Sequence, residues 1–440
     1  MPKYKTRKEV VTTGKTSKEY LVKDAVTGEL IKTNSYLASD KSIHLQLLNN
    51  IQFIYELDLA NLELESFGVD VKIDRGLRRF NAELNSHNPA KLEKTLQKRL
   101  AYFSQINDVF SDYYFIQKAN QTRSVNQCLT HWFYPYKGKY HPQMIRALLN
   151  VIGAEEGDTI LDPFIGSGTT ALECHLLNIN CIGIDISPLC VALSKVKTQS
   201  LSALSEIKKF KDIVTSKRSK QGDGLFAGKD HDDIKDERVR NFYLISEMIA
   251  HSDSSRRGRD FEFSFRTNIN KMIASLEDFK QVQKKLDLQL GKTDIRKGDA
   301  RKLELDDESI DGIICSPPYS IALNYVQNDA HSLSALGYDL NHIKDDFIGV
   351  RGTGLDKFEL YNSDMAQSYK EMYRVLKHGK YCVIVIGNVT FEGKEVDTTK
   401  VVIDYCQNIG FKLVNQIDKI IFGLYNVMQK EYILIFHKPE

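Results

Sequence analysis

The stretch Leu161-Asp162-Pro163-Phe164-Ile165-Gly166-Ser167-Gly168-Thr169-Thr170 decides the fold of this chain. It ends a strand predicted over residues 158–164 and opens a helix predicted over 169–178, so it forms the turn between them. Gly166 and Gly168 allow backbone amides to come close to a ligand, and the helix start offers unpaired N–H groups. The turn has neither the Lys of a Walker loop nor the GxGxxG spacing of dinucleotide sites, which argues against both kinds of ligand.

Strands and helices also alternate on both sides of this turn. Such alternation predicts an α/β fold with a parallel sheet, whose ligands bind at the carboxyl ends of the strands. The last two predicted strands are separated by a short connection and predict an antiparallel hairpin at one edge. The segments concerned are, in order, a helix over 141–152, strands over 181–185, 293–300 and 309–316, a helix over 365–377, a strand over 381–387, a helix over 398–408, and strands near 411–418 and 431–437.

With its neighbours, the glycine turn resembles the S-adenosylmethionine site of the amino-methyltransferases, whose hallmark is DPFxGSGTT. This resemblance implies a Rossmann-like class I methyltransferase sheet and S-adenosyl-L-methionine as the cofactor. It also implies that the polar and small residues of the turn bind that cofactor, namely Asp162, Phe164, Gly166, Ser167, Gly168, Thr169 and Thr170.

Two aspartates lie at the ends of the next two predicted strands. Asp185 lies about 20 residues beyond the turn, where an acid commonly accepts hydrogen bonds from the ribose hydroxyls. Asp299, in the segment GDARKL, matches the acid that hydrogen-bonds the adenine amino group in the family that the turn resembles. We therefore expect both carboxylates at the nucleoside end of the cofactor.

The tetrad Ser316-Pro317-Pro318-Tyr319 follows the strand predicted over 309–316. Two consecutive prolines end the strand and stiffen the loop. An exocyclic amino nitrogen is a poor nucleophile, because its lone pair is delocalised into the ring. If Ser316 Oγ and the Pro317 carbonyl each accepted one amino hydrogen, that lone pair would turn toward the methyl group. Tyr319 is expected to stack on the flipped-out base.

This tetrad resembles the (D/N/S)PPY motif of N6-adenine and N4-cytosine methyltransferases. Serine in the first position is more typical of the cytosine-N4 group, whereas Asp or Asn usually marks adenine enzymes. Cysteine is the nucleophile of cytosine-C5 enzymes, but there it directly follows a proline. Cys315 instead ends a strand before Ser316, and we expect it to be a packed strand residue.

The aromatic segment 130–142, with the sequence THWFYPYKGKYHP, precedes the glycine turn. It resembles the family segment that folds over the methionine end of the cofactor. The resemblance implies cofactor contacts for Lys139, His141 and Pro142. In this chain the tetrad comes after the glycine turn, whereas in many SPPY cytosine enzymes it comes first.

The composition is that of an average soluble globular protein. The chain has 440 residues, and 60 Lys and Arg against 58 Asp and Glu give a net charge of +2 that names no partner. No apolar stretch approaches the roughly 20 residues needed to cross a bilayer, and no apolar segment follows the basic N-terminus. The seven cysteines are scattered without a CxxC pair, which favours buried thiols. We expect a cytoplasmic protein without a metal site or membrane contact.

The resemblance covers only half of the chain. Residues 126–200 and 293–440 predict the methyltransferase domain. Residues 1–125 predict an α-rich accessory region, because apolar residues recur at three- and four-residue spacing over 41–65 and 90–118. Residues 201–292 predict a helical insertion. It lies between the predicted strand that ends at Asp185 and the next predicted strand, which contains Asp299. We expect target recognition in one of these two unmatched regions.

The sequence therefore predicts an S-adenosylmethionine-dependent DNA amino-methyltransferase that forms N4-methylcytosine at specific sites. Its expected partner is double-stranded DNA, with a cognate restriction endonuclease in the same system but no stable complex between them. N6-adenine methylation of DNA and methylation of an RNA base remain open alternatives. RNA relatives more often carry (D/N)PPYG, and position 320 here is Ser. A catalytically silent nucleic-acid-binding scaffold is disfavoured by the intact turn and tetrad.

Overall fold

The computed structural model divides into two compact units, which we describe separately. The N-terminal unit comprises Met1–Cys128 and Arg146–Gly153, and the C-terminal unit comprises Leu129–Ile145 and Ala154–Glu440. The structure describes residues 18–23, 30–35, 42–74, 76–84, 86–120, 124–218, 234–318, 330–335, 339, 346–391, 394–422 and 428–440.

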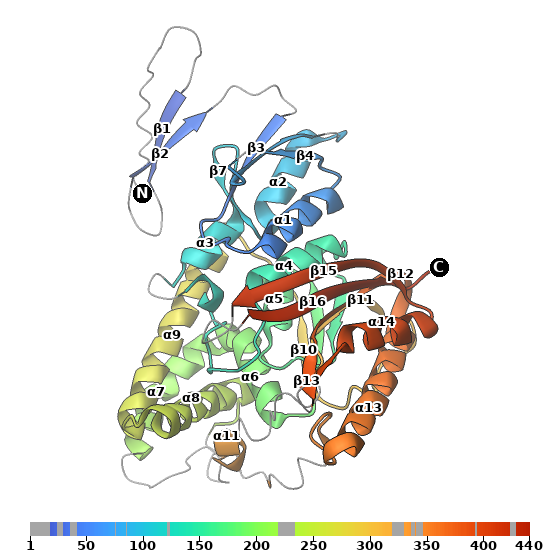
Figure 1. The fold of residues 1–440 in the computed structure, drawn as a ribbon. Coiled ribbons are helices and arrows are strands. Elements are labelled where there is room, and N and C mark those ends of the chain that lie inside the picture. The colour runs from blue at the N-terminus through green and yellow to red at the C-terminus, as the bar shows by residue number, and fades with distance from the viewer. Residues whose placement is uncertain are drawn as a thin grey trace. The chain divides into compact units, whose positions relative to one another are not determined.

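A seven-stranded sheet forms the centre of the C-terminal unit (Figure 1). The first five strands in the order run parallel, and β16 pairs antiparallel with both β12 and β15. The Rossmann-like α/β sheet with an antiparallel edge hairpin is therefore confirmed. The strands in spatial order are β10 (Thr293–Lys297), β9 (Asn180–Asp185), β8 (Thr159–Asp162), β11 (Ile310–Cys315), β12 (Leu376–Gly387), β16 (Met428–His437) and β15 (Lys412–Phe422).

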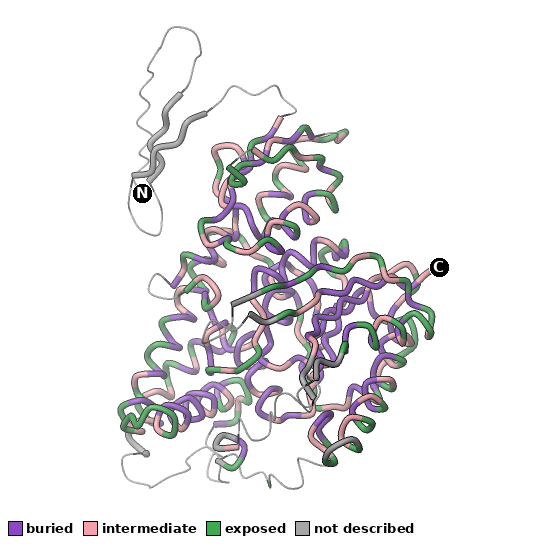
Figure 2. Tube along the Cα trace, viewed as in Figure 1, coloured by how far each residue is buried: buried purple, intermediate pink, exposed green. Residues whose placement is uncertain are grey.

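Most residues of the central strands are buried, as the purple tube along them shows (Figure 2), and most of the buried ones are apolar. Ile313 and Cys315 of β11 point to the face that is covered by α13 (Gly354–Val375) and α14 (Thr398–Asn408). Ile314, the residue between them, is equally buried on the other face. Such continuous apolar runs are typical of parallel strands in α/β proteins. Helix α4 (Pro142–Val151) precedes β8, α5 (Thr169–Leu176) connects β8 to β9, and α6 (Pro188–Gln199) follows β9.

The insertion between β9 and β10 is helical, as expected. Its described residues form a short 3-10 turn (Ser200–Ala203) and the longer helices α7 (Leu204–Arg218), α8 (Glu237–Arg257) and α9 (Phe261–Leu286). Their buried side chains share one apolar core with Leu189 and Leu193 of α6. Trp132 Nε1 donates to Ser275 Oγ of α9 at 2.7 Å, which ties the segment before α4 to the insertion. The insertion therefore packs as part of the C-terminal unit.

The N-terminal unit contains more sheet than the sequence predicted. Its five-stranded antiparallel sheet has the order β4 (Val71–Ile73), β5 (Arg79–Glu83), β3 (Ser42–Leu47), β6 (Phe103–Ile106), β7 (Val109–Phe110). Only α1 (Ile54–Ser66), α2 (Pro89–Arg99) and α3 (Asp112–Lys118) bear out the predicted helices. In β3, Ile43, Leu45 and Leu47 are buried and alternate with more exposed residues, so the relevant period is two rather than three or four.

Two strand pairs, a 3-10 turn and a short helix complete the described elements. β1 (Lys18–Lys23) pairs antiparallel with β2 (Leu30–Ser35), and β13 (Val389–Phe391) pairs antiparallel with β14 (Lys394–Val396). A 3-10 turn spans Val125–Gln127, and α11 spans Ala330–Ala335.

All seven cysteines are buried free thiols, which confirms the expectation from their scattered spacing. Cys315 is completely buried, and its Sγ lies 3.8 Å from Met372 Sδ on α13. Burial raises the pKa of the Cys315 thiol well above its usual range. This thiol is therefore a packed strand residue, as predicted. Within the described ranges, no helix is both long and apolar enough to cross a membrane.

Candidate active site

A cleft lies at the carboxyl ends of the parallel strands, where the strand order reverses. From β8 the chain first adds β9 and β10 on one side, and it then returns to add β11 and β12 on the other side of β8. The switch point therefore lies between β8 and β11. Open α/β sheets bind ligands at such a switch point. The cleft encloses about 1050 Å³, its open mouth included. Residues that follow β8, β9, β10 and β11 line it, together with parts of segments 136–140 and 346–348.

Asp162, the last residue of β8, stabilises the glycine turn through hydrogen bonds to both of its ends. Its side chain is fully buried, and its two oxygens accept hydrogen bonds from Phe164 N at 3.1 Å and Thr170 Oγ1 at 2.7 Å. Burial raises the pKa of Asp162 to about 7, outweighing these hydrogen bonds. The carboxyl group thus links the start of the turn to the start of α5.

The two glycines of the turn have conformations that other residues rarely adopt. Gly166 has φ +49° and Gly168 has φ +75°. A Cβ on Gly168 would lie 2.7 Å from Ser194 Oγ and 2.8 Å from Ser194 Cα on α6. Gly168 N donates to Ile165 O at 2.8 Å, which closes the turn. Glycine at position 168 is therefore required both by its φ and by the approach of α6.

Asp185, the last residue of β9, lines the cleft and receives backbone N–H groups on both oxygens. Gly166 N donates to Oδ2 at 2.9 Å, and Ser187 N donates to Oδ1 at 2.8 Å. The carboxylate thereby fixes the glycine turn relative to the next strand. Asp185 is the residue for which the sequence predicts hydrogen bonds to the ribose hydroxyls, and this role stays a prediction.

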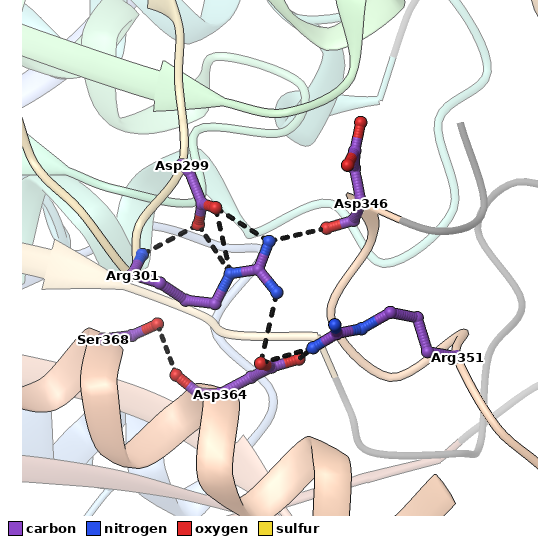
Figure 3. A network of polar contacts seen from close by, with 6 residues as sticks. All are labelled: Asp299, Arg301, Asp346, Arg351, Asp364 and Ser368. Carbon is purple, nitrogen blue, oxygen red and sulfur yellow. Dashed lines mark hydrogen bonds and ion pairs between the residues drawn. The ribbon is translucent and has the colours of Figure 1, made fainter. Parts of the chain in front are cut away.

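Asp299 follows β10 and is held by one neighbour, Arg301 (Figure 3). The backbone N, Nε and one terminal nitrogen of Arg301 donate to its two oxygens at 2.7–2.9 Å. Burial alone would raise the pKa of Asp299, but the hydrogen bonds from Arg301 hold it below its usual value. Asp299 is therefore an ionised acceptor at the edge of the cleft.

Ser316 comes directly after β11 and lines the opposite side of the cleft. Its hydroxyl donates to the Val385 carbonyl of β12 at 2.9 Å. A serine hydroxyl has one proton and two acceptor lone pairs. Because the proton points to β12, the lone pairs of Ser316 Oγ are the part that an N–H donor from a substrate would meet.

The two prolines continue this loop in different environments. Pro317 is buried, whereas Pro318 is partly exposed and lines the cleft. The Pro318 carbonyl accepts a hydrogen bond of 2.9 Å from the buried Tyr361 hydroxyl of α13. Tyr319, the last member of the tetrad, lies outside the described residues.

The aromatic segment before α4 forms another wall. Lys139 lines the cleft, and its Nζ donates to His131 O at 2.9 Å. Pro142 begins α4, and His141 precedes it. Burial and the nearby Lys419 lower the pKa of His141 to about 4, so its imidazole is neutral at pH 7.

The structure brings half of the predicted site residues to the cleft surface. Those that line it are Lys139, Phe164, Gly166, Ser167, Asp185, Asp299, Ser316 and Pro318. The predicted residues that do not line it are Asp162, Gly168, Thr169, Thr170, Pro317, His141 and Pro142. Several of the second group support the first, as the bonds of Asp162 show.

Sequence reasoning missed several cleft residues. Tyr136 lies in the aromatic segment, and its hydroxyl would be 3.4 Å from a Cβ on Gly166. Its place three residues before Lys139 was the available signal. Phe347 and Ile348 also line the cleft, but nothing in their local sequence marks them. Arg301 does not line the cleft, but it holds Asp299 at the cleft edge, and no local sequence pattern marks this role.

Comparison with known proteins agrees with this geometry. Residues 23–196 match the model of the N6/N4 methyltransferase family, which is described as DNA methylase. Over 348 residues the chain is 22% identical to the type II methyltransferase M.BsoBI of Geobacillus stearothermophilus, covering 65% of this chain and 67% of that protein.

A second relative acts on a different nucleic acid according to its name. The chain is 25% identical over 173 residues to a tRNA (guanine(10)-N2)-dimethyltransferase of Methanocaldococcus jannaschii, covering 39% of this chain and 45% of that protein. The chain thus spans under half of this relative. Among solved structures, a SAM-dependent methyltransferase from Methanosarcina mazei aligns with a TM-score of 0.31 and 13% identity, over 65% of this chain and 94% of that one. The fold assignment rests on the strand order described above.

Proposed function

We propose that this chain, whose residues 23–196 match the model of the N6/N4 family of DNA methylases, transfers a methyl group to the exocyclic amino group of a base in DNA. The cofactor is S-adenosyl-L-methionine, which supplies an electrophilic methyl group on a sulfonium. The Ser316 hydroxyl carries the proposal, because its proton is donated to Val385 O and its lone pairs are left to accept. An amino group of cytosine or adenine offers the matching N–H donors.

The residues of the cleft fit this cofactor. Asp185 and Asp299 supply acceptors for the hydroxyl and amino groups of a nucleoside, at the ends of neighbouring strands. Lys139 supplies a cation for the carboxylate at the methionine end. We assign the ribose to Asp185 and the adenine amino group to Asp299, and we assign the lining residues of the glycine turn to the same ligand.

The tetrad supplies the positioning of the target. In this proposal Ser316 Oγ and the Pro317 carbonyl each accept one amino hydrogen, which holds the nitrogen with its lone pair toward the methyl group. Tyr361 stiffens the loop from behind through its bond to Pro318 O. The amino proton that is released on transfer leaves to solvent, since neither acceptor is a strong base.

We further propose cytosine N4 as the target atom, with site-specific modification of double-stranded DNA as the role. The serine in the first tetrad position supports cytosine, and the similarity to a type II methyltransferase supports a restriction–modification role. Adenine N6 is the alternative with the same donors. RNA is a second candidate substrate, supported by the similarity to a tRNA guanine-N2 enzyme.

One experiment separates these substrates. The protein is incubated with labelled S-adenosylmethionine and a mixture of DNA and RNA, and the modified nucleoside is identified by mass spectrometry. We expect N4-methyldeoxycytidine in the wild type and none in Ser316→Ala. N6-methyldeoxyadenosine or a methylated ribonucleoside would replace the cytosine assignment, and no labelled nucleoside would contradict the proposed transfer itself.

A further inference from the structure

The guanidinium of Arg301 contacts two cleft-lining residues, Asp299 and Asp346, and also Asp364 of helix α13, which lies outside the cleft lining (Figure 3). It holds the Asp299 carboxylate, and one terminal nitrogen also donates to the Asp346 carbonyl at 3.1 Å. Its other terminal nitrogen donates to Asp364 Oδ1 of α13 at 3.1 Å. The Arg301 side chain is 15% exposed and that of Asp364 is 7% exposed. One side chain therefore joins the end of β10, the segment before Phe347 and α13.

The bonds from Arg301 fix the direction of the Asp299 carboxylate. Three N–H groups of Arg301, its backbone N, its Nε and one terminal nitrogen, donate to Asp299, and the Nε–H is shared between the two oxygens. Each Asp299 oxygen therefore accepts two contacts from Arg301. The Asp299 side chain is still 34% exposed and lines the cleft, so a ligand there meets an oriented, ionised carboxylate. A carboxylate is an acceptor only, so it attracts an N–H group and repels a carbonyl oxygen at the same place.

We infer that Arg301 is a positioning residue that makes the cleft selective for an amino-bearing purine nucleoside over an oxo-bearing one. Arg301 sets the direction of the Asp299 carboxylate and, through the Asp346 carbonyl, fixes the adjacent cleft residues Phe347 and Ile348. Asp364 holds the guanidinium from the far side and is itself bound by Arg351 at 2.5–2.6 Å. This inference rests on the proposed function, because it takes Asp299 as the acceptor for the cofactor's adenine.

The test measures nucleoside selectivity rather than activity. S-adenosylhomocysteine and S-inosylhomocysteine differ in the purine amino group, which is a carbonyl in the second. Their dissociation constants are measured by calorimetry for the wild type and for Arg301→Met. We expect the wild type to prefer the adenosyl ligand by at least about tenfold, the effect of one hydrogen bond to a charged acceptor. In Arg301→Met the preference should fall below about threefold.

Arg351→Met is the matched control. Arg351 pairs with the same Asp364, and within the described ranges its hydrogen bonds go to that residue alone. Removing it takes away one positive charge beside Asp364, as Arg301→Met does, but it leaves the bonds between Arg301 and Asp299 in place. We expect Arg351→Met to keep the wild-type preference. A general loss of stability would weaken both ligands alike and would leave their ratio unchanged.

Each outcome decides between the two proposals. A folded Arg301→Met that keeps the wild-type ratio overturns the positioning role and leaves the proposed function intact. If Arg301→Met does not fold, Arg301→Lys and Asp364→Asn take its place. A reduced ratio in both supports the role, and the wild-type ratio in both overturns it. A wild type that binds neither ligand contradicts the cofactor site itself, and one that binds both equally contradicts Asp299 as the adenine acceptor and this inference with it.

Discussion

The glycine turn after β8 and the proline loop after β11 face the same cleft but are supported differently. The turn is held by Asp162 and Asp185, whose oxygens accept N–H groups from within or just beside it. The loop is held by Val385, 69 residues beyond Ser316, and by Tyr361, 43 residues beyond Pro318. The turn that we propose to bind the constant cofactor is thus supported largely by residues close to it, whereas the loop that we propose to meet the variable substrate depends on distant elements.

Ser316→Ala should have the largest effect, and it should alter the function of the proline loop alone. This change removes the acceptor in the cleft without touching the turn, so the methyl transfer rate should fall by about a thousandfold. Cofactor affinity should stay within about twofold of the wild type, because no bond of the turn is lost. Single-turnover transfer of labelled methyl and calorimetry with S-adenosylhomocysteine measure the two quantities. A rate near that of the wild type would contradict the role of Ser316.

Gly168→Ala should instead disturb the glycine turn. Its Cβ would meet the Ser194 backbone at 2.8 Å in a left-handed conformation, so we expect about 3 kcal/mol of lost stability and weakened cofactor binding. Gly157→Ala is the control, since Gly157 also has a positive φ, +89°, but has nothing within 4 Å of an added Cβ. It should cost only about 1 kcal/mol. Equal melting temperatures of the two variants would contradict the close approach of α6.

The pH dependence of stability sharpens the comparison, because it reports on Asp162 under the turn. The folded-state pKa of about 7 lies above the unfolded value of 3.8, so the folded state binds the proton more tightly. This contribution to stability is fully present below about pH 4 and is lost as the pH rises through 7. Between pH 5 and 7 the free energy of unfolding should fall by about 2 kcal/mol more in the wild type than in Asp162→Asn. Denaturant titrations at both pH values measure this difference, and parallel curves would contradict it.

Tyr361→Phe has the smallest expected effect. It removes one hydrogen bond to the Pro318 carbonyl and keeps the ring in its buried position. A single hydrogen bond contributes about 1 kcal/mol, so the methyl transfer rate should fall about fivefold with unchanged cofactor affinity. Tyr369→Phe, on the same helix and also buried, should leave the rate as it is. A drop in cofactor affinity in Tyr361→Phe would show that the two sides of the cleft are coupled.

The sequence predicted those helices and strands whose boundaries are set by local residue patterns. The helix over 398–408 and the strand over 181–185 agree with α14 and β9 almost to the residue, because their apolar patterns and caps are local. In β3, by contrast, six residues are too few to separate a period of two from a helical spacing. Phe347 and the partners of Arg301 depend on tertiary packing across tens of residues, so no local pattern could mark them.

Trp132 is the single tryptophan of the chain, and its indole bridges the segment that carries Lys139 and helix α9 of the insertion. Its emission is therefore an intrinsic optical reporter placed between a wall of the cleft and the insertion. Any ligand that shifts the segment changes the polarity around one fluorophore, without a label or a background from other indoles. Titrations of cofactor and of nucleic acid, added separately, then become readable in the same unmodified protein.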